Sequence, residues 1–361
     1  MFWYIHVIAV FFYCQVVCMK RTDYCGIDAV KLLCALLVVC IHTEPFSAVN
    51  GTLNSLVVNG VCRVAVPFFF VSSAFLFFSG TAPTLPSRAA FSRYIVRLLT
   101  LYGIWSAVYF PFTVAKMVRS GSVVGALSVF GVWLKNMFFS AGYGFLWYLP
   151  ASVVAMCLVY SLRKRGVPLR VLLTVAFLLY GVGLLGQSYF GLLRPLAQYP
   201  PLWTTLRAVG RVIGTTRNGV FEGMAFAAIG CAASTAKPPT VRRALVGFLF
   251  SLLLLICESA LLGRLGWKRG YDMYLSLLPC AYFLLQTARC IPPFSERIAV
   301  RMRQYSTLIY FLHMLPVALV STLPLHSLVG SALVLALTLA ASTAVLHLSE
   351  TRRFAFLKTI Y

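Results

Sequence analysis

The chain has 361 residues, of which 60% are hydrophobic and only 11% are charged. A soluble protein carries roughly 25% charged residues, so this composition excludes an ordinary soluble domain. The formal net charge is +23. The basic residues lie mostly in short segments between apolar runs, without a basic tail that carries interleaved aromatics, and this pattern speaks against nucleic-acid binding and for contact with membrane lipid.

Apolar runs of about 18–22 residues recur along the whole chain, which is typical of membrane-spanning helices. The runs are continuous rather than alternating, as expected for helices, which satisfy their own backbone hydrogen bonds in lipid. We therefore predict an all-α polytopic membrane bundle of about ten transmembrane helices, in chain order near residues 26–44, 60–80, 95–117, 145–162, 168–187, 218–236, 243–262, 271–289, 305–324 and 328–348.

The N-terminal stretch MFWYIHVIAVFFYCQVVC, residues 1–18, is apolar but lacks the basic start and the cleavage site of a signal peptide. It is either an additional helix or a mis-assigned start, and the second interpretation is favoured because residues from Met19 resemble an ordinary beginning. Residues 19–361 are expected to form one membrane domain. Stretches 118–144 and 188–217 are the long connections, and such connections are often functional.

The charged loops predict an orientation, because lysine and arginine concentrate on the cytoplasmic side of membrane proteins. The larger share falls in segments that would be cytoplasmic if residues 19–25 are, so we expect the C-terminus to be cytoplasmic too. The 11 cysteines include no CxxC pair and mostly lie inside apolar runs. They predict neither a disulfide framework nor a metal site.

The first predicted helix carries Asp28, Lys31 and His42, and ionisable residues inside a membrane are functional candidates. Lys31 and His42 are eleven residues apart, which returns them to nearly one helix face at a separation of roughly 16 Å along the axis. Asp28, one turn before Lys31, is a natural ion-pair partner. The alternative is that Asp28 and Lys31 extend to the membrane boundary and have no further role.

His42 is the side chain best suited to move a proton near neutral pH. The alternative is an interfacial histidine that only makes hydrogen bonds. Glu44 lies about 200° around the helix from His42, so it can orient the imidazole only if the helix ends at Pro45.

Further candidates lie in later helices. Arg93 and Arg97 share a helix face that suits phosphate, although positive-inside topology alone would also explain them. His313 has the alternative of a hydrogen bond in helix packing. The remaining polar candidates at membrane entries are Arg63, Arg217, Asn218 and Glu222.

The polar motifs, taken in order, resemble those of the acyltransferase-3 family of bacterial integral-membrane acyltransferases. The stretches are GIDAVKLLCALLVVCIHTEPF, VPFFFVSSAFLFF, RYIVRLLTLYGIW, FLWYLPA, TRNGVFEGMAFAAIG and YFLHML. The resemblance covers about residues 19–350. The family has a basic residue, ten intervening residues and an essential histidine on its first helix, which correspond here to Lys31 and His42. The lysine is a departure from the usual arginine, as Ser72-Ser73 is from the family's Ser-Gly.

The resemblance implies transfer of an acyl group, commonly acetyl, from cytoplasmic acyl-coenzyme A to a hydroxyl of a cell-envelope glycan or lipid-linked acceptor in a bacterial cell membrane. Under it, Lys31, Arg88, Arg93 and Arg97 serve the acyl-CoA side, while His42 and Glu44 serve catalysis. Related sequences also form the membrane part of vancomycin-resistance-type serine racemases. The alternative function is therefore a small-solute, amino-acid-type transporter with the same fold.

Overall fold

The computed structural model describes residues 24–81, 84–139 and 143–361, and within these ranges the chain forms helices and no strands. The N-terminal stretch 1–18 lies outside the described residues. The helices are, in chain order, α2 (Cys25–Thr43), α3 (Gly51–Asn59), η2 (Val61–Val64), α4 (Ala65–Ser79), α5 (Arg88–Arg119), α6 (Val123–Phe139), α7 (Tyr148–Lys164), α8 (Leu169–Leu185), η3 (Phe190–Gln198), α9 (Pro200–Ile213), η4 (Gly219–Gly223), α10 (Met224–Thr235), α11 (Val241–Arg264), α12 (Leu277–Arg289), α13 (Glu296–Leu312), α14 (Met314–Val320), α15 (Ser327–Ser349) and η5 (Arg352–Ile360).

The all-helical multi-pass character predicted from the apolar runs is confirmed. Among the described residues, five helical segments are long and apolar enough to cross a membrane, namely Cys25–Thr43, Gly51–Ser79, Arg88–Arg119, Val241–Arg264 and Ser327–Ser349. The pair α8 and η3, bent by 63°, would add a sixth. The number of ten spans stays a prediction, since several of the expected spans are shorter or are interrupted by a break.

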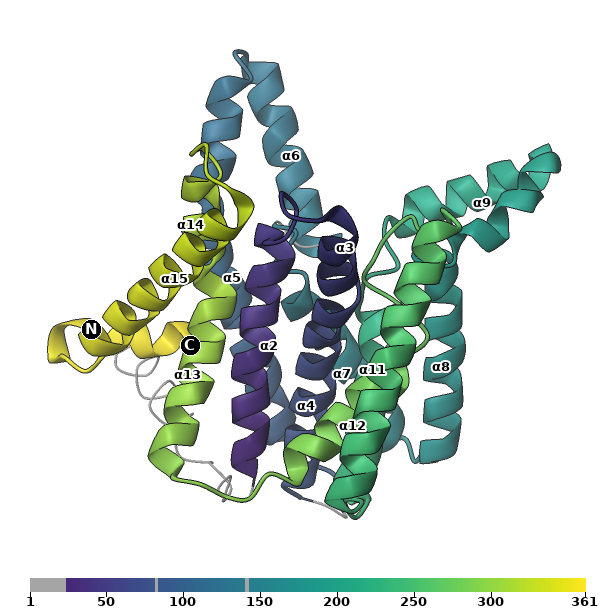
Figure 1. Cartoon of the computed structure of the whole chain (residues 1–361), viewed down its shortest axis with the longest axis vertical. Helices are drawn as coiled ribbons and strands as arrows, with labels where there is room; N and C mark the ends of the chain where they lie inside the picture. The colour runs from purple at the N-terminus through teal and green to yellow at the C-terminus, as the bar shows by residue number, and fades with distance from the viewer. Residues whose placement is uncertain (1–23, 82–83, 140–142) are drawn as a thin grey trace.

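The centre of the bundle is built from α2 and α4, with α13 and α15 on one side and α11, α12 and α8 on the other (Figure 1). Phe68 and Phe75 of α4 are fully buried. Apolar burial gains little in lipid, so close backbone approach carries more of the packing. Gly230 of α10 shows this approach, because a β-carbon there would lie 2.3 Å from the carbonyl oxygen of Val71.

Helices α2 and α13 pack side by side and run in the same direction. Near their first residues, the Cys25 thiol donates to the carbonyl oxygen of Phe294 over 3.5 Å. One turn further, Asp28 pairs with Arg303. At the other end of the two helices lie His42 and His313, whose rings are in contact. The pair therefore has two polar ends separated by an apolar middle.

Three breaks in regular helix lie at the His42 end of the bundle. The expected span 60–80 opens with the short helix η2, which separates α3 from α4, the expected span 218–236 opens with the π-helical turn η4, and the expected span 305–324 breaks at His313. A fourth expected span, 271–289, begins at Leu277 instead, which leaves residues 271–276 as a loop. Irregular backbone at membrane depth is tolerated where it lines a polar site, so these breaks direct attention to this end.

Candidate functional site

His42 lies one residue before the end of α2 and is exposed. The helix ends at Thr43, and Glu44 adopts a left-handed conformation with φ of 47° and ψ of 60°. Pro45 explains the position of this ending, because a residue before proline is disfavoured in the right-handed helical region. The imidazole is thus held on a helix terminus where a substrate can reach it.

His313 packs against His42 from the break between α13 and α14. The ring centroids are 5.1 Å apart, and the His313 side chain is 0% exposed. Nδ1 of His313 lies 3.1 Å from the carbonyl oxygen of Ile309, and Nε2 has no hydrogen-bond partner. A carbonyl only accepts, so Nδ1 carries the hydrogen of the neutral ring, and Nε2 is left with an unused lone pair.

Asp272 brings two arginines together next to the histidines. Its carboxylate pairs with Arg63 at 2.6 Å and with Arg217 at 3.3 Å. Arg217 also lies over the ring of Trp147, with its guanidinium carbon 5.0 Å from the ring centroid. All three charges act electrostatically on His42. Two cations and one anion leave this group with an excess of positive charge.

Arg63 lies on the short helix η2, and its side chain is held by the last residues of α3. Its Nε donates to the carbonyl oxygen of Val58 over 3.1 Å, and its Nη2 donates to the side chain of Asn59 over 3.0 Å. These bonds orient the third nitrogen, Nη1, toward Asp272. The break in the expected span 60–80 therefore positions a cation at the site.

Glu222 lies within the electrostatic reach of the same three charges. It is only 1% exposed, and neither carboxylate oxygen has a hydrogen-bond partner. The side-chain oxygen of Asn218 accepts from the backbone N–H groups of Val220 and Phe221, at 2.9 and 3.0 Å, and so caps the turn η4 that carries Glu222. The structure thus places Glu222, on a turn capped by Asn218, within the electrostatic reach of Arg63 and Arg217.

Two residues of this end, Asp272 and Glu258, were not singled out from the sequence. Glu258 accepts from the backbone N–H groups of Leu275 and Ser276, at 2.7 and 2.8 Å, and from the Tyr189 hydroxyl at 2.8 Å. It therefore anchors the loop that presents Asp272. The sequence could have pointed to both residues through the scarcity of acidic side chains. The whole chain holds only 8 of them, and each one near an apolar run needs a partner.

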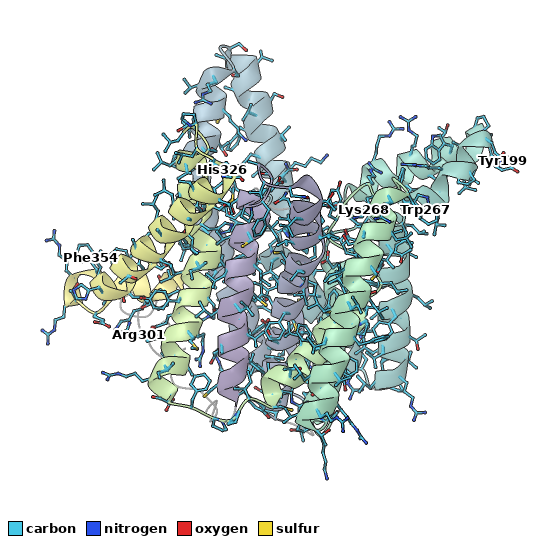
Figure 2. The ribbon with its side chains drawn as sticks, viewed as in Figure 1. Tyr199, Trp267, Lys268, Arg301, His326 and Phe354 are labelled. Atoms are coloured by element: carbon cyan, nitrogen blue, oxygen red, sulfur yellow. The ribbon has the colours of Figure 1, made fainter. Side chains whose placement is uncertain are left out.

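Lys268 lies on the same loop, outside the spanning segments, near the upper end of the bundle (Figure 2). Its Nζ donates to the Ser259 hydroxyl over 3.2 Å and lies 5.1 and 5.4 Å from the ring centroids of Tyr271 and Tyr274. Partial burial and then the charge of Arg63 lower the pKa of Lys268 to about 8, against the opposing effect of Glu258. This lysine is a third residue that the sequence did not single out.

Glu44 accepts a hydrogen bond from a residue of α3. The Asn54 side-chain amide donates to its Oε2 over 3.4 Å. The charges that act on His42 come instead from Arg63, Arg217 and Asp272. Orientation of the imidazole by Glu44 therefore stays a prediction.

The remaining basic candidates lie at the opposite end. Asp28 accepts from Nη2 of Arg303 over 2.9 Å, so it forms an ion pair with a residue of α13. Arg88, Arg93 and Arg97 are exposed on the first turns of α5. Arg97 donates to the carbonyl oxygen of Tyr361 over 3.2 Å, and the Tyr361 hydroxyl contacts Ser349. Glu350, the residue after Ser349, pairs with Arg301, which lies on α13 two residues before Arg303.

Among the described residues, no three His, Cys, Asp or Glu side chains are grouped closely enough to hold a metal ion.

Comparison with known proteins gives one family match and several relatives. A family model described as "Acyltransferase domain" matches residues 25–347. An "Amino-acid racemase" of Enterococcus faecalis is 29% identical over 267 residues, which is 73% of this chain and 36% of the relative. A "Serine/alanine racemase" of Enterococcus gallinarum is 30% identical over 267 residues, 72% of this chain and 36% of the relative. The chain thus spans little more than a third of these relatives, and no solved structure matches it.

Proposed function

The chain belongs to the acyltransferase-3 family, and we propose that it is an O-acyltransferase of the bacterial cell membrane with a cytoplasmic C-terminus. It moves an acyl group, commonly acetyl, from cytoplasmic acyl-coenzyme A to a hydroxyl of a cell-envelope saccharide or related acceptor. The observation that carries this proposal is the exposed imidazole of His42, which contacts the ring of His313 and lies within the electrostatic reach of the positive group around Asp272.

His42 acts as the general base. It takes the proton of the acceptor hydroxyl while the oxygen attacks the thioester carbonyl, and the proton then passes to the coenzyme A thiolate as the carbon–sulfur bond breaks. The tetrahedral intermediate carries an oxyanion, which Arg63 and Arg217 would stabilise from fixed positions. Asp272 holds both guanidiniums in place, so they need no reorganisation during the reaction.

The acyl donor, acyl-coenzyme A, enters from the end of the bundle opposite to His42. Arg93 and Arg97, with Arg88, bind its phosphates as exposed cations at the start of α5. The pantetheine arm then extends along the bundle past Lys31 toward His42, over roughly the 16 Å that eleven helical residues span. This division of the molecule is supported by the separation of its two polar ends, which are joined by the parallel pair of α2 and α13.

The test is transfer of labelled acetyl from acetyl-coenzyme A to membrane-extracted lipid-linked and polysaccharide acceptors, with the purified protein in liposomes. The wild type is expected to transfer label. His42→Ala at matched expression is expected to lose transfer by about 10²–10⁴-fold, the usual contribution of a general base. Full transfer by His42→Ala would refute the mechanism.

The second candidate, a small-solute transporter, is favoured by a different observation. The turn η4 at the start of α10 and the break between α13 and α14 at His313 place irregular helix beside a mixed set of arginines and carboxylates, and discontinuous helices of this kind mark transporter sites. Uptake of labelled amino acid into the same liposomes, without acetyl transfer, would support this function instead.

A further inference from the structure

Helix α9 leaves the bundle near the end that carries His42. It runs more across the spans than along them, with Tyr199 at its far end (Figures 1 and 2). It follows the 63° bend between α8 and η3, and packs on η3, where Trp203 contacts Phe190 with ring centroids 6.3 Å apart. At 14 residues it is roughly 21 Å long. A helix with this placement can lie flat at a membrane surface.

The sequence of α9, PPLWTTLRAVGRVI, separates apolar from basic residues. Leu202, Leu206, Val209 and Ile213 recur at intervals of three and four, which places them on one helix face. Leu202, Val209 and Ile213 remain 45%, 49% and 39% exposed, so nothing in the structure covers most of this apolar stripe. A large apolar stripe left open on a projecting helix needs an apolar environment.

The opposite face is cationic. Arg207 and Arg211 are one turn apart and both exposed. The connection from Phe190 to Arg217 holds the further arginines Arg194 and Arg217 and no acidic residue. Tyr199 and Trp203 add the aromatic side chains that gather at membrane interfaces. Apolar stripe, basic face and aromatic residues together are the signature of a helix that lies in the headgroup layer and binds anionic lipid.

We propose that α9 is an interfacial helix that binds anionic phospholipid in the leaflet on the His42 side, with its apolar stripe among the acyl chains and its arginines at the lipid phosphates. A protein partner fits less well, because the exposed apolar stripe is narrow and lies directly beside the membrane-spanning bundle.

The position of α9 connects the lipid surface to the candidate site. The helix ends at Gly214, whose φ of +71° reverses the chain, and Thr216 then donates to the carbonyl oxygen of Gly183 over 2.8 Å. The next residue is Arg217, which pairs with Asp272. An acceptor carried on a lipid would therefore reach His42 along the edge that α9 covers. This last step rests on the proposed function, whereas the lipid contact of α9 does not.

The experiment places the photo-crosslinking amino acid benzoylphenylalanine at single positions of the full chain in liposomes of phosphatidylcholine and phosphatidylglycerol. The positions on the apolar stripe are Leu202, Val209 and Ile213. Thr204 and Ala208, exposed on the other face of the same helix, are matched controls. Phe250, exposed on the spanning helix α11, is the positive control. After illumination, mass spectrometry counts lipid adducts at each position.

Lipid adducts are expected at the three stripe positions at a yield close to that of Phe250, and at low yield at Thr204 and Ala208. Phosphatidylglycerol should be enriched among the adducts relative to its share in the liposomes. The double variant Arg207→Gln/Arg211→Gln should remove that enrichment, since each arginine near an anionic surface is worth about fivefold in affinity. Equal yields on both faces, or enrichment that survives the double variant, would overturn the proposal, whatever the acyl-transfer assay gives.

Discussion

The buried ring of His313 lies against the ring of His42, with the centroids 5.1 Å apart, although the two residues are 271 positions apart, and Nε2 of His313 has no hydrogen-bond partner. The hydrogen bond from Nδ1 of His313 to the carbonyl oxygen of Ile309 decides which nitrogen offers a lone pair. We infer that His313 is a positioning residue for the proposed base, because its ring packs against the His42 imidazole and its Nε2 keeps a lone pair available to a hydrogen-bond donor.

Replacement of His313 should therefore lower turnover while donor binding is retained. For His313→Phe, which keeps a ring but removes the acceptor, kcat should fall about tenfold or more, equivalent to about 1.4 kcal/mol, with an unchanged KM for acetyl-coenzyme A. His313→Gln, which keeps a donor and an acceptor, should recover part of the loss. Steady-state kinetics in liposomes checks this. Equal losses for both variants would indicate a packing role alone.

Removal of the Asp272 carboxylate should destabilise the His42 end of the bundle. Asp272→Asn leaves Arg63 and Arg217, both partly buried, next to each other without their shared anion. We expect the free energy of unfolding to fall by about 1–3 kcal/mol. This is less than for a fully buried ion pair, because all three side chains remain partly exposed to solvent. Thermal unfolding in detergent measures the change in Tm.

The matched control for that variant is Glu350→Gln, which breaks the Arg301–Glu350 pair. Both of these side chains are about half exposed, at 48% and 53%. Exposed pairs contribute little to stability, so Tm should not change measurably. A larger loss for Glu350→Gln than for Asp272→Asn would contradict the assignment of Asp272 as the organising charge.

Lys268 should react with amine-directed reagents at lower pH than an ordinary lysine. The pKa of about 8 means that the ammonium form dominates below pH 8 and the reactive free amine above it. Free lysine derivatives, with a pKa near 10.4, hold well under one per cent free amine at pH 8. Labelling by a succinimidyl ester between pH 7 and 9, quantified by peptide mass spectrometry against Nα-acetyl-lysine amide, should show a midpoint near pH 8.

Arg63→Gln tests the cause of that shift. The positive charge of Arg63 helps to lower the pKa of Lys268, so its removal should move the labelling midpoint to higher pH. A midpoint that stays in place would mean that partial burial alone accounts for the reactivity.

The arginines at the start of α5 should govern affinity for the donor. For Arg93→Gln and Arg97→Gln we expect the KM for acetyl-coenzyme A to rise about tenfold each, while kcat changes less, since each loses a charge-assisted contact to phosphate. Arg119→Gln, an exposed residue at the other end of the same helix, is the control and should leave KM unchanged. A KM that is independent of Arg93 and Arg97 would place the donor phosphates elsewhere.

Local sequence predicted the regular helices well. The expected span 26–44 is found as α2 at Cys25–Thr43, and the expected span 328–348 as α15 at Ser327–Ser349. Both are long apolar runs with a clear stop signal. Pro45 ends the first, and the side chain of His326 accepts from the backbone of Leu328 at the start of the second. Signals of this kind act within one turn, so they can be read from neighbouring residues.

The helix boundaries that the sequence predicted wrongly depend on residues far away along the chain. The loop 271–276 looks like the beginning of a helix from its own apolar residues, but Glu258 of α11 takes the backbone N–H groups of Leu275 and Ser276 and so stabilises the loop. The helix break at His313 likewise goes with a contact to another helix, because the His313 ring packs against His42 of α2. Such effects come from packing partners that a window of sequence does not contain.

The sequence by itself determined a multi-pass helical protein, the polar stripe of Asp28, Lys31 and His42, and the motif order of its family. It did so because apolar runs, helical spacing and ionisable residues in lipid are local features. Only the tertiary structure decided which charges meet, as in Arg63 with Asp272, 209 residues apart, and Arg303 with Asp28, 275 residues apart. A charge in a membrane bundle must find a partner, but the identity of that partner follows from how the helices pack.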